Sequence, residues 1–396
     1  MSEAVKTVRR DEEYEKLMAR INKQFGEGTI MRLGDRRAGT FRIETIPTQS
    51  LKLNQIIGRG GVPRGRFTYI FGPEASGKTS VALGVVAEAQ KKGEKAAWID
   101  AETAFDAEYA AQLGVDVNDL YLVQPEDGET AMDVAEALVA SGLFGVVVVD
   151  SLAALVPRAE LEGTMSDQQM ALQARLIGKA LRKLNSVVRK SNCAFIYINQ
   201  IRDSMSPHGP REVVPGGRAP KFWATLSIEV RKTDWVRDGD EIIGHRVRYK
   251  TVKNRLAPPQ KVTEVEIIYG KGIDHVQEVV DVCIEEGIIT RAGAWYTLRK
   301  EDGTPMLRNG KEIKWNGMKA IVEEARSNER FFEYLRDRFY AKVTASNDAV
   351  AEAPEEEAEP TEETPPTEVE ETAALEVGEA VRTENEQGED LFSLGD

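Results

Sequence analysis

The stretch from Arg66 to Ala87 constrains the fold more than any other part of the sequence. It begins with Phe67 to Phe71, a short apolar and aromatic run typical of a buried strand. The next eight residues fit the pattern G-x-x-x-x-G-K-[ST]: Gly72, Pro73, Glu74, Ala75, Ser76, Gly77, Lys78 and Thr79. After Ser80 the apolar residues follow a helical period. A strand, a glycine-rich loop and a helix in this order predict a phosphate-binding loop.

The residue types of this loop suit a nucleoside triphosphate. The glycines let the backbone fold its N–H groups around an anion, and the following helix points the positive end of its dipole at the same place. The Lys78 ammonium is placed to reach the outer phosphates, and the Thr79 hydroxyl is placed to bind Mg²⁺. We therefore expect a nucleoside triphosphate site that includes Mg²⁺.

Strand and helix patterns alternate after the loop. Apolar runs predict strands at 95–100, 145–149 and 193–199, and helical periodicity predicts helices at 130–141 and 168–190. Alternation of this kind predicts an α/β fold with a largely parallel sheet and helices on both faces. Ligands bind such sheets beyond the carboxyl ends of the strands.

Three polar residues follow strands at that edge. Asp150 ends the run VVVVD and looks like a Walker B carboxylate, which holds Mg²⁺. Glu102 is placed to orient or deprotonate a water for attack on the γ-phosphate. Gln200 stands between a strand and a long loop, so it is a candidate sensor of the γ-phosphate.

The sequence divides into four predicted parts. Residues 1–34 combine an amphipathic helix with an extended segment, and this arm packs either on its own core or on a neighbouring subunit. Residues 35–273 form the nucleotide-binding core. Residues 274–346 have helical segments around a Gly-rich, Trp-bearing region and predict a small α+β domain. Residues 347–396 are rich in Glu, Pro, Thr and Ala, so we expect them to be disordered.

The net charge of −14 is unevenly distributed along the chain. Residues 347–396 carry 18 acidic residues and one Arg, a net of −17, whereas the first 346 residues have a net charge of +3. The first 346 residues, the body of the chain, are therefore slightly basic, and their charge does not exclude the binding of nucleic acid. We expect the acidic tail to compete with DNA for this body in a salt-dependent manner.

Membrane and secretory signals are not found in the sequence. No apolar run reaches 18 residues, and the first residues contain no apolar signal segment. Cys193 and Cys283 stand far apart without Cys or His at ligand spacing, which fits a reducing compartment. The prediction is a cytoplasmic protein with no membrane partner.

Two loops interrupt the alternation, at 157–167 and 201–217. The second is longer than a compact domain usually contains without a function. It contains Gly216 and Gly217, with Arg202 and other basic residues nearby. A loop of this composition is suited to bind along the phosphate backbone of a nucleic acid. A plain surface loop is the other interpretation.

Seven motifs stand in the order and at the spacing of one family: GPEASGKT, IDAE, VVVVDSLAAL, YINQIR, PGG, VKNR and AGAWY. Through them, residues 10–340 resemble the bacterial RecA recombinases, and INKQFGEGTIMRLGD is similar to the subunit-linking arm of that family. The resemblance implies a RecA-like P-loop fold and a DNA-dependent ATPase that uses ATP and Mg²⁺. It also implies a helical homo-oligomer on single-stranded DNA that pairs with homologous duplex DNA in recombinational repair. The SOS response, with its repressor, mediator proteins and single-strand-binding protein as partners, is implied in the same way.

The resemblance further implies roles for individual residues. Lys78, Glu102 and Gln200 match catalytic positions, with Glu102 as the base. The loop residues Gly72 to Ser80 and Asp150 match nucleotide contacts, and Asp106 and Tyr109 match residues that hold the adenine. Lys253 and Arg255 match cations that reach a neighbouring subunit's ATP, and Tyr269 and Gly270 match residues that close over the adenine from that subunit. The positions that match DNA contacts are Met170, Arg175, Arg182, Arg202, Gly216 and Gly217.

The sequence departs from the family pattern at several positions. The second loop is divergent at 208–215, Arg255 stands in place of a second Lys, and Thr103 follows Glu102 in place of a His. We therefore expect a member of the family with a divergent second DNA-binding loop. Two other classes fit the same core: a P-loop ring motor such as a hexameric helicase, and a DNA-binding filament scaffold with weak hydrolysis.

Overall fold

The computed structural model describes residues 3–32, 43–163, 171–203 and 212–352. The chain separates into the units Met1–Val343 and Thr344–Asp396. The second unit contributes only the end of the last helix to the described residues. Met170, parts of both predicted loops and most of the acidic tail lie outside the described residues.

One large sheet forms the centre of the first unit. Its strands are β3 (Phe67–Gly72), β4 (Lys95–Asp100), β5 (Leu120–Val123), β6 (Phe144–Asp150), β7 (Ala194–Gln200), β10 (Leu226–Asp238), β11 (Glu241–Asn254), β12 (Val262–Ile268) and β13 (Gly272–Ile273). The order across the sheet is β13-β12-β11-β10-β3-β7-β6-β4-β5. Neighbouring strands from β10 to β5 run parallel, and β11, β12 and β13 extend the sheet antiparallel. The predicted largely parallel α/β fold is confirmed.

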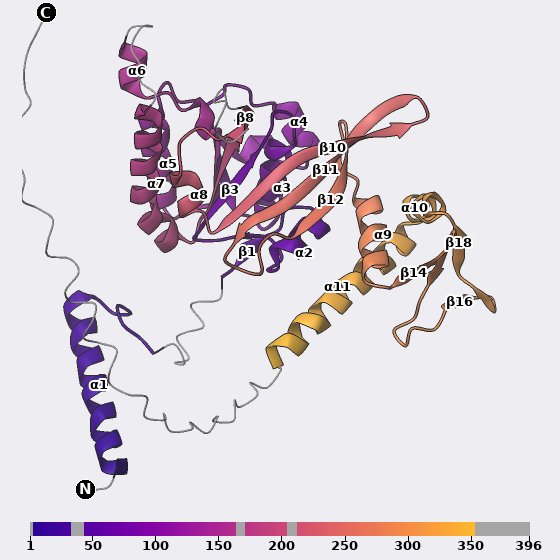
Figure 1. Ribbon diagram of the computed structural model, residues 1–396, viewed down its shortest axis with the longest axis horizontal. Coiled ribbons are helices and arrows are strands. Elements are labelled where there is room, and N and C mark those ends of the chain that lie inside the picture. The colour runs from indigo at the N-terminus through magenta and orange to yellow at the C-terminus, as the bar shows by residue number, and fades with distance from the viewer. Residues whose placement is uncertain (1–2, 33–42, 164–170, 204–211, 353–396) are drawn as a thin grey trace, which may run out of the picture. The chain divides into compact units, whose positions relative to one another are not determined.

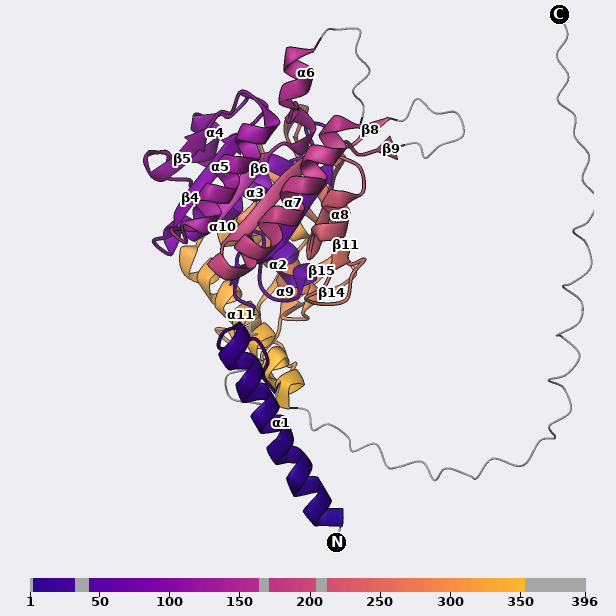
Figure 2. The same ribbon diagram turned by 90° about the vertical axis from the view of Figure 1, so that its left-hand side faces the viewer.

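Helices cover both faces of the sheet (Figures 1 and 2). Helix α3 (Lys78–Lys91) packs on one face, and helices α5 (Gly128–Ala140) and α7 (Leu172–Ser191) pack on the other. Successive strand residues point to opposite faces, so the apolar run of β6 supplies both cores. Val146 and Val148 face α3, whereas Val147 and Val149 face α5 and α7.

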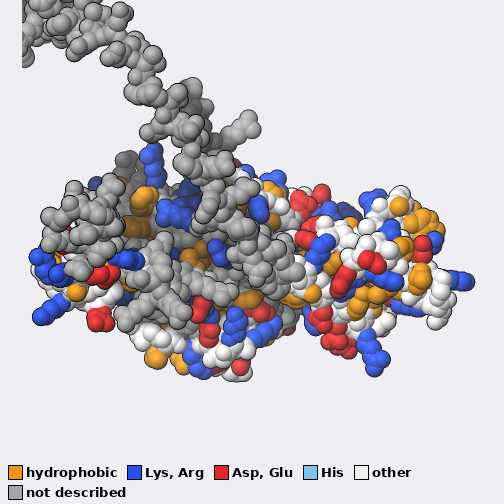
Figure 3. All heavy atoms as spheres, turned by 90° about the horizontal axis from the view of Figure 1, so that it is seen from below, with side chains coloured by type: hydrophobic (Ala, Val, Ile, Leu, Met, Phe, Trp, Pro, Cys, Tyr) orange, Lys and Arg blue, Asp and Glu red, His pale blue; other side chains and the backbone are white. Residues whose placement is uncertain are grey.

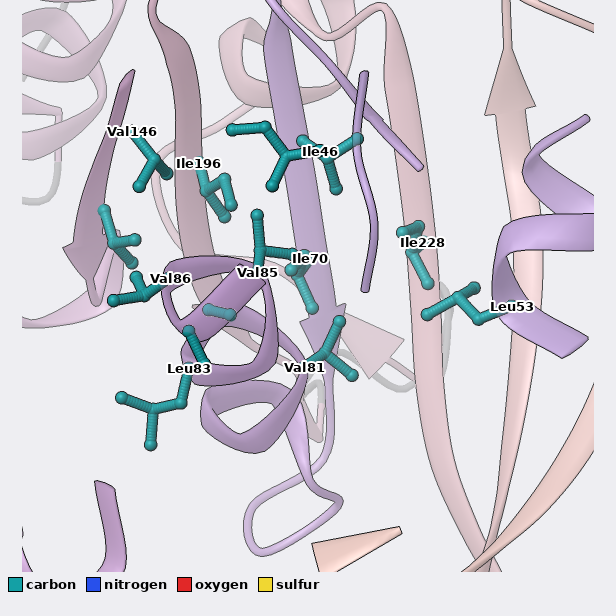
Figure 4. Packing of buried hydrophobic residues seen from close by; sticks show 14 of the residues in the cluster. Ile46, Leu53, Ile70, Val81, Leu83, Val85, Val86, Val146, Ile196 and Ile228 are labelled. Atoms are coloured by element: carbon teal, nitrogen blue, oxygen red, sulfur yellow. The ribbon is translucent and has the colours of Figure 1, made fainter. Parts of the chain in front are cut away.

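Figure 4 shows the core on the α3 side, where Val81, Val85 and Val86 lie among the strand residues Ile70, Val146 and Ile196. All six of these side chains are buried. This packing fixes the first turn of α3 against the end of β3, which determines where the phosphate-binding loop lies.

Smaller elements complete the core. They are α2 (Leu51–Ile57), α4 (Ala107–Gln112), α6 (Arg158–Glu162), α8 (Ala219–Trp223), the 3₁₀ turns Val117–Asp119 and Leu152–Ala154, and the two-residue strands β1 (Thr45–Ile46), β2 (Val62–Pro63), β8 (Arg202–Asp203) and β9 (Glu212–Val213). Strands β8 and β9 pair antiparallel and close the base of the second loop.

The N-terminal arm is a helix, α1 (Glu3–Phe25), followed by an irregular segment. Residues 29–32 of the predicted extended segment belong to no strand of this chain. The backbone of Ile30 bonds to the Asn22 side chain and not to any described strand of this chain. Asn22 accepts from the Ile30 N–H at 3.0 Å and donates to the Ile30 carbonyl at 3.0 Å. Backbone groups need such partners, and here a side chain supplies them.

Residues from Asp274 onward build an α+β region with its own apolar core. Its elements are α9 (His275–Glu285), β14 (Ile289–Ala292), β15 (Trp295–Leu298), β16 (Leu307–Arg308), β17 (Lys311–Glu312), β18 (Lys314–Asn316), α10 (Met318–Ser327) and α11 (Glu329–Glu352). Helix α10 was not predicted. Helix α11 includes residues 347–352, so the chain remains helical beyond the point where the sequence predicted disorder.

A buried carboxylate attaches α9 to the core. Glu278 accepts hydrogen bonds from the Ser50 hydroxyl at 2.5 Å and from the Lys52 N–H at 3.1 Å, at the start of α2. Burial raises the pKa of Glu278, and these hydrogen bonds oppose the rise. Lys52 in turn donates to Asp281 at 3.0 Å.

Charges are mixed on the surface. Lys and Arg side chains are interspersed with Asp and Glu side chains over the face shown in Figure 3, in keeping with the small net charge of the first 346 residues. Within the described ranges, none of the helices has the length and apolar character needed to cross a membrane.

Trp98→Ala is expected to lower the free energy of unfolding by about 3–5 kcal/mol, because a large core side chain is removed. Trp98 is 1% exposed on β4 and meets the Phe105 ring edge to face at 5.6 Å. Urea denaturation followed by circular dichroism measures the change. The matched control is Trp235→Ala, since Trp235 is 51% exposed; it should cost less than about 1 kcal/mol. Equal losses for the two variants would contradict the placement of Trp98 in the core.

Candidate nucleotide site

The phosphate-binding loop connects β3 to α3 as predicted. Gly72 lies so close to β10 that an added Cβ would fall 2.0 Å from the carbonyl oxygen of Val230. Gly77 has φ +93°, in the left-handed region that favours glycine. Both glycines of the motif are therefore required by backbone geometry, at the carboxyl edge of the sheet.

Lys78 is the buried cation of this loop. Its Nζ donates to the carbonyl of Pro73 at 2.6 Å. Burial lowers the pKa of Lys78, and the charges of Asp150, Glu102 and Glu74 oppose this effect. The ammonium thus lies among the acidic residues that the sequence predicted for the site.

Thr79 and Asp150 meet across the carboxyl edge. The Thr79 hydroxyl donates to Oδ2 of Asp150 at 2.9 Å. Burial raises the pKa of Asp150 to about 6, although the hydrogen bond from Thr79 acts in the opposite direction. A hydroxyl and a carboxylate at this separation are oxygen ligands of the type that Mg²⁺ prefers, so the pair fits the predicted ion.

Glu102 and Gln200 meet across the end of β6, because Glu102 follows β4 and Gln200 ends β7, the two strands that flank β6. Oε1 of Glu102 accepts from Nε2 of Gln200 at 2.9 Å and from the Ser151 hydroxyl at 2.5 Å. The loop that carries Glu102 is held by Asp100, whose carboxylate accepts from the N–H groups of Ala104 and Phe105. The candidate base and the candidate sensor are thus directly connected.

A cavity of about 300 Å³ opens beside the loop. It is lined by Ala75, Ser76, Gly77, Lys78, Thr79, Ser80, Tyr109, His245, Ile267, Ile268, Tyr269 and Gly270. Tyr109 projects from α4, where Asp106 caps the first turn, and its hydroxyl bonds to that of Ser80 at 2.7 Å.

Tyr269 and Gly270 are the residues that the resemblance placed over the adenine of a neighbouring subunit's nucleotide. Both line the cavity of their own chain. The reason is topological: β12 runs antiparallel to β11 and returns the chain to the carboxyl edge, so the turn after Ile268 faces the phosphate-binding loop.

Lys253 and Arg255 do not line this cavity. The N–H of Arg255 donates to Thr225, which itself donates to Phe67, the first residue of β3. The two cations therefore lie toward the amino end of β3, away from the phosphate-binding loop. Nζ of Lys253 donates to the carbonyls of Lys221 and Phe222 at 2.9 and 2.8 Å. Burial lowers the pKa of Lys253, and the charges of Arg255 and Lys221 lower it further.

Several candidate DNA-binding residues gather around α7. Arg175 and Arg182 belong to this helix, and Arg202 lies in β8 at the base of the second loop. Gly216 and Gly217 have φ of +84° and +69°, and an added Cβ on Gly216 would come within 2.8 Å of Ile177 of α7. The turn therefore packs on the helix that carries the arginines.

The base of the second loop is tied to the site. The Asn199 side chain donates to the carbonyl of Pro215 at 2.9 Å. Arg231 of β10 holds Glu212 through two hydrogen bonds of 2.9 and 2.5 Å. Asn199 precedes Gln200, so one strand end contacts both the candidate base and the loop.

Sequence reasoning missed part of the cavity wall. His245, Ile267 and Ile268 come from β11 and β12 and lie outside the recognised motifs, although VKNR and the Tyr269–Gly270 pair are close to them in sequence. Their alternating pattern could have indicated an antiparallel pair, but only the return of β12 to the carboxyl edge makes them part of the site. Asp100 and Ser151 adjoin predicted site residues and could have been included on that ground.

The chain is similar to known RecA proteins over most of its length. A model of the RecA N-terminal domain matches residues 12–274. The chain is 45% identical over 329 residues to Protein RecA of Chloroherpeton thalassium, which covers 83% of this chain and 90% of that protein. It is 52% identical over 281 residues to Protein RecA of Clostridium acetobutylicum, covering 71% and 80% respectively. With a RecA-like sheet, a complete phosphate-binding loop and similarity over most of its length, the chain belongs to the bacterial RecA family of recombinases.

Proposed function

We propose that this chain is an ATPase that assembles into a helical filament on single-stranded DNA and catalyses pairing and strand exchange with homologous duplex DNA. This activity would serve recombinational repair and a coprotease role in the SOS response. The observation that carries the proposal is the hydrogen bond between Gln200 and Glu102. This bond connects the carboxyl edge of the sheet, where the nucleotide would bind, with Gln200, the residue that precedes the second loop.

The residues of the site support ATP hydrolysis. The loop N–H groups and Lys78 bind the phosphates, and Glu102 takes a proton from the attacking water. The Ser151 hydroxyl and the Gln200 amide fix the orientation of the Glu102 carboxylate. Mg²⁺, held by Thr79 and Asp150, supplies positive charge for the phosphate oxygens when it is bound.

Two features support self-assembly. Lys253 and Arg255 lie away from their own cavity, and neither forms a salt bridge with the described residues. A neighbouring subunit's phosphates would provide the anionic partner that they lack. Helix α1 exposes apolar side chains, with Phe25 66%, Tyr14 57% and Leu17 40% exposed. A neighbouring subunit would cover this face.

ATP hydrolysis measured with and without single-stranded DNA, together with electron microscopy and a strand-exchange assay, tests the proposal. We expect hydrolysis to rise with DNA, helical filaments to form, and exchange to occur with homologous but not heterologous duplex. Closed rings would support the ring-motor alternative. Filaments that hydrolyse ATP equally slowly with and without DNA would support the scaffold alternative.

Gln200→Ala is expected to leave nucleotide affinity unchanged and to reduce DNA stimulation of hydrolysis about tenfold or more, the cost of about one charge-assisted hydrogen bond. The variant removes the amide that contacts Glu102 without changing the phosphate-binding loop. Steady-state ATPase rates at increasing DNA concentration measure the effect. Gln90→Ala is a matched control, because the Gln90 side chain bonds only the backbone of Asp116, in the structure described. Full DNA stimulation in Gln200→Ala would refute the coupling.

A further inference from the structure

His245 lies on the wall of the nucleotide cavity, opposite the phosphate-binding loop. It belongs to β11 and is the register partner of Ile267 on β12, so both side chains point to the same face of the sheet. Both line the cavity together with Gly77 and Tyr109. On this wall His245 lies with Ile267, Ile268 and the Tyr269–Gly270 turn, and it is the buried polar side chain among them.

The imidazole of His245 is buried without a hydrogen-bond partner. Its residue is only 8% exposed, yet neither Nδ1 nor Nε2 bonds to any of the described residues. The Tyr269 ring lies against it, with ring centroids 5.6 Å apart and planes at 45°. Buried polar groups normally have partners, so an unpartnered imidazole facing a cavity indicates a ligand.

The other polar side chains of the cavity are hydrogen-bonded, belong to the phosphate end or, in the case of Tyr269, are half exposed to solvent. The Ser80 and Tyr109 hydroxyls bond to each other. Lys78 and Thr79 bond to Pro73 and Asp150 and lie where the phosphates bind. The part of the cavity between Tyr109 and Tyr269 remains for the nucleoside, and beside it His245 is the buried polar side chain without a partner among the described residues.

We propose that His245 binds the nucleoside part of the nucleotide through a hydrogen bond to a ribose hydroxyl or to the edge of the base. The inference rests on the proposed ATP binding and adds a residue that selects the nucleoside. Burial lowers the pKa of His245, and the charge of Lys232 lowers it further, so both effects favour the neutral ring. A neutral imidazole offers one N–H donor and one acceptor nitrogen, which suits both hydroxyls and base edges.

Titration calorimetry with ADP and without DNA tests this contact. His245→Phe keeps an aromatic ring of similar size and removes both nitrogens; His245→Leu serves the same purpose if the Phe variant folds poorly. We expect the Kd for ADP to rise about tenfold, which corresponds to one hydrogen bond of about 1.4 kcal/mol. His245→Asn or His245→Gln, which place an amide near one of the two ring nitrogens, should recover part of the affinity.

A second ligand separates the two sources of the hydrogen bond. With 2′,3′-dideoxy-ADP, a ribose contact predicts equal affinity for the wild type and His245→Phe, whereas a base contact predicts that the tenfold difference persists. Unchanged ADP binding by the Phe and Leu variants would overturn the proposal. A loss of ADP affinity that is just as large in the Asn and Gln variants would overturn it too, since the changed shape of the side chain would then explain the loss. If the wild type bound no ADP, the proposed function would be wrong as well, so the two failures are distinguishable.

Discussion

Lys78→Ala is expected to lower the rate of DNA-stimulated ATP hydrolysis about 10²–10³-fold, the usual loss when a preorganised charge is removed from a transition state. Lys78 is buried at the first turn of α3, and its Nζ lies beside the carbonyl of Pro73 within the loop. Negative charge grows on the transferred phosphate during the reaction, and among the described residues Lys78 is the one Lys or Arg that lines the cavity. Values of kcat and KM for ATP at saturating single-stranded DNA measure the loss.

Lys92→Ala is the matched control for this variant. Lys92 caps the far end of the same helix and is exposed. Its loss should leave kcat within about twofold of the wild type, because an exposed charge this far from the phosphates is screened. A Lys78→Ala protein that kept more than a third of its activity would show that the loop does not hold the reacting phosphates.

Glu102→Gln is expected to lower kcat about 10²–10⁴-fold, the range of general-base catalysis, while nucleotide affinity is retained. The amide oxygen can still accept from the Ser151 hydroxyl and the Gln200 amide, so the geometry around residue 102 is preserved. What is lost is the ability to take a proton from water. Single-turnover hydrolysis and separate ADP binding distinguish the two effects.

Glu108→Gln provides the comparison for a change of charge alone. Glu108 is an exposed carboxylate in the first turn of α4, near the same cavity wall. Equal reductions in the two variants would mean that negative charge near the site, and not a base at position 102, controls the rate. Normal hydrolysis in Glu102→Gln would assign the base to another group.

Local patterns were sufficient to predict the parallel half of the sheet. The motif from Gly72 to Thr79 specifies its own strand, turn and helix, and continuous apolar runs identify β4, β6 and β7 because these strands are buried on both faces. Asp150, Glu102 and Gln200 could be placed together because parallel strands end at one edge.

The antiparallel half could not be predicted in the same way. Residues from β11 and β12 reach the cavity only because β12 reverses direction, and no local period encodes which edge a strand returns to. For this reason His245 was not included among the predicted site residues. The local pairing of Asn22 with the backbone of Ile30 likewise depends on side-chain contacts that no periodic pattern encodes.

The cavity is closed by residues almost two hundred positions apart, from Gly77 to Tyr269. A nucleotide that touches both walls can bind only after the antiparallel strands have docked on the parallel ones. Thermodynamic linkage then requires the nucleotide to favour the docked state by RT ln(1 + [L]/Kd), about 2.7 kcal/mol at a hundredfold excess over Kd. The nucleotide that is hydrolysed therefore also stabilises the packing of the antiparallel strands on the rest of the sheet.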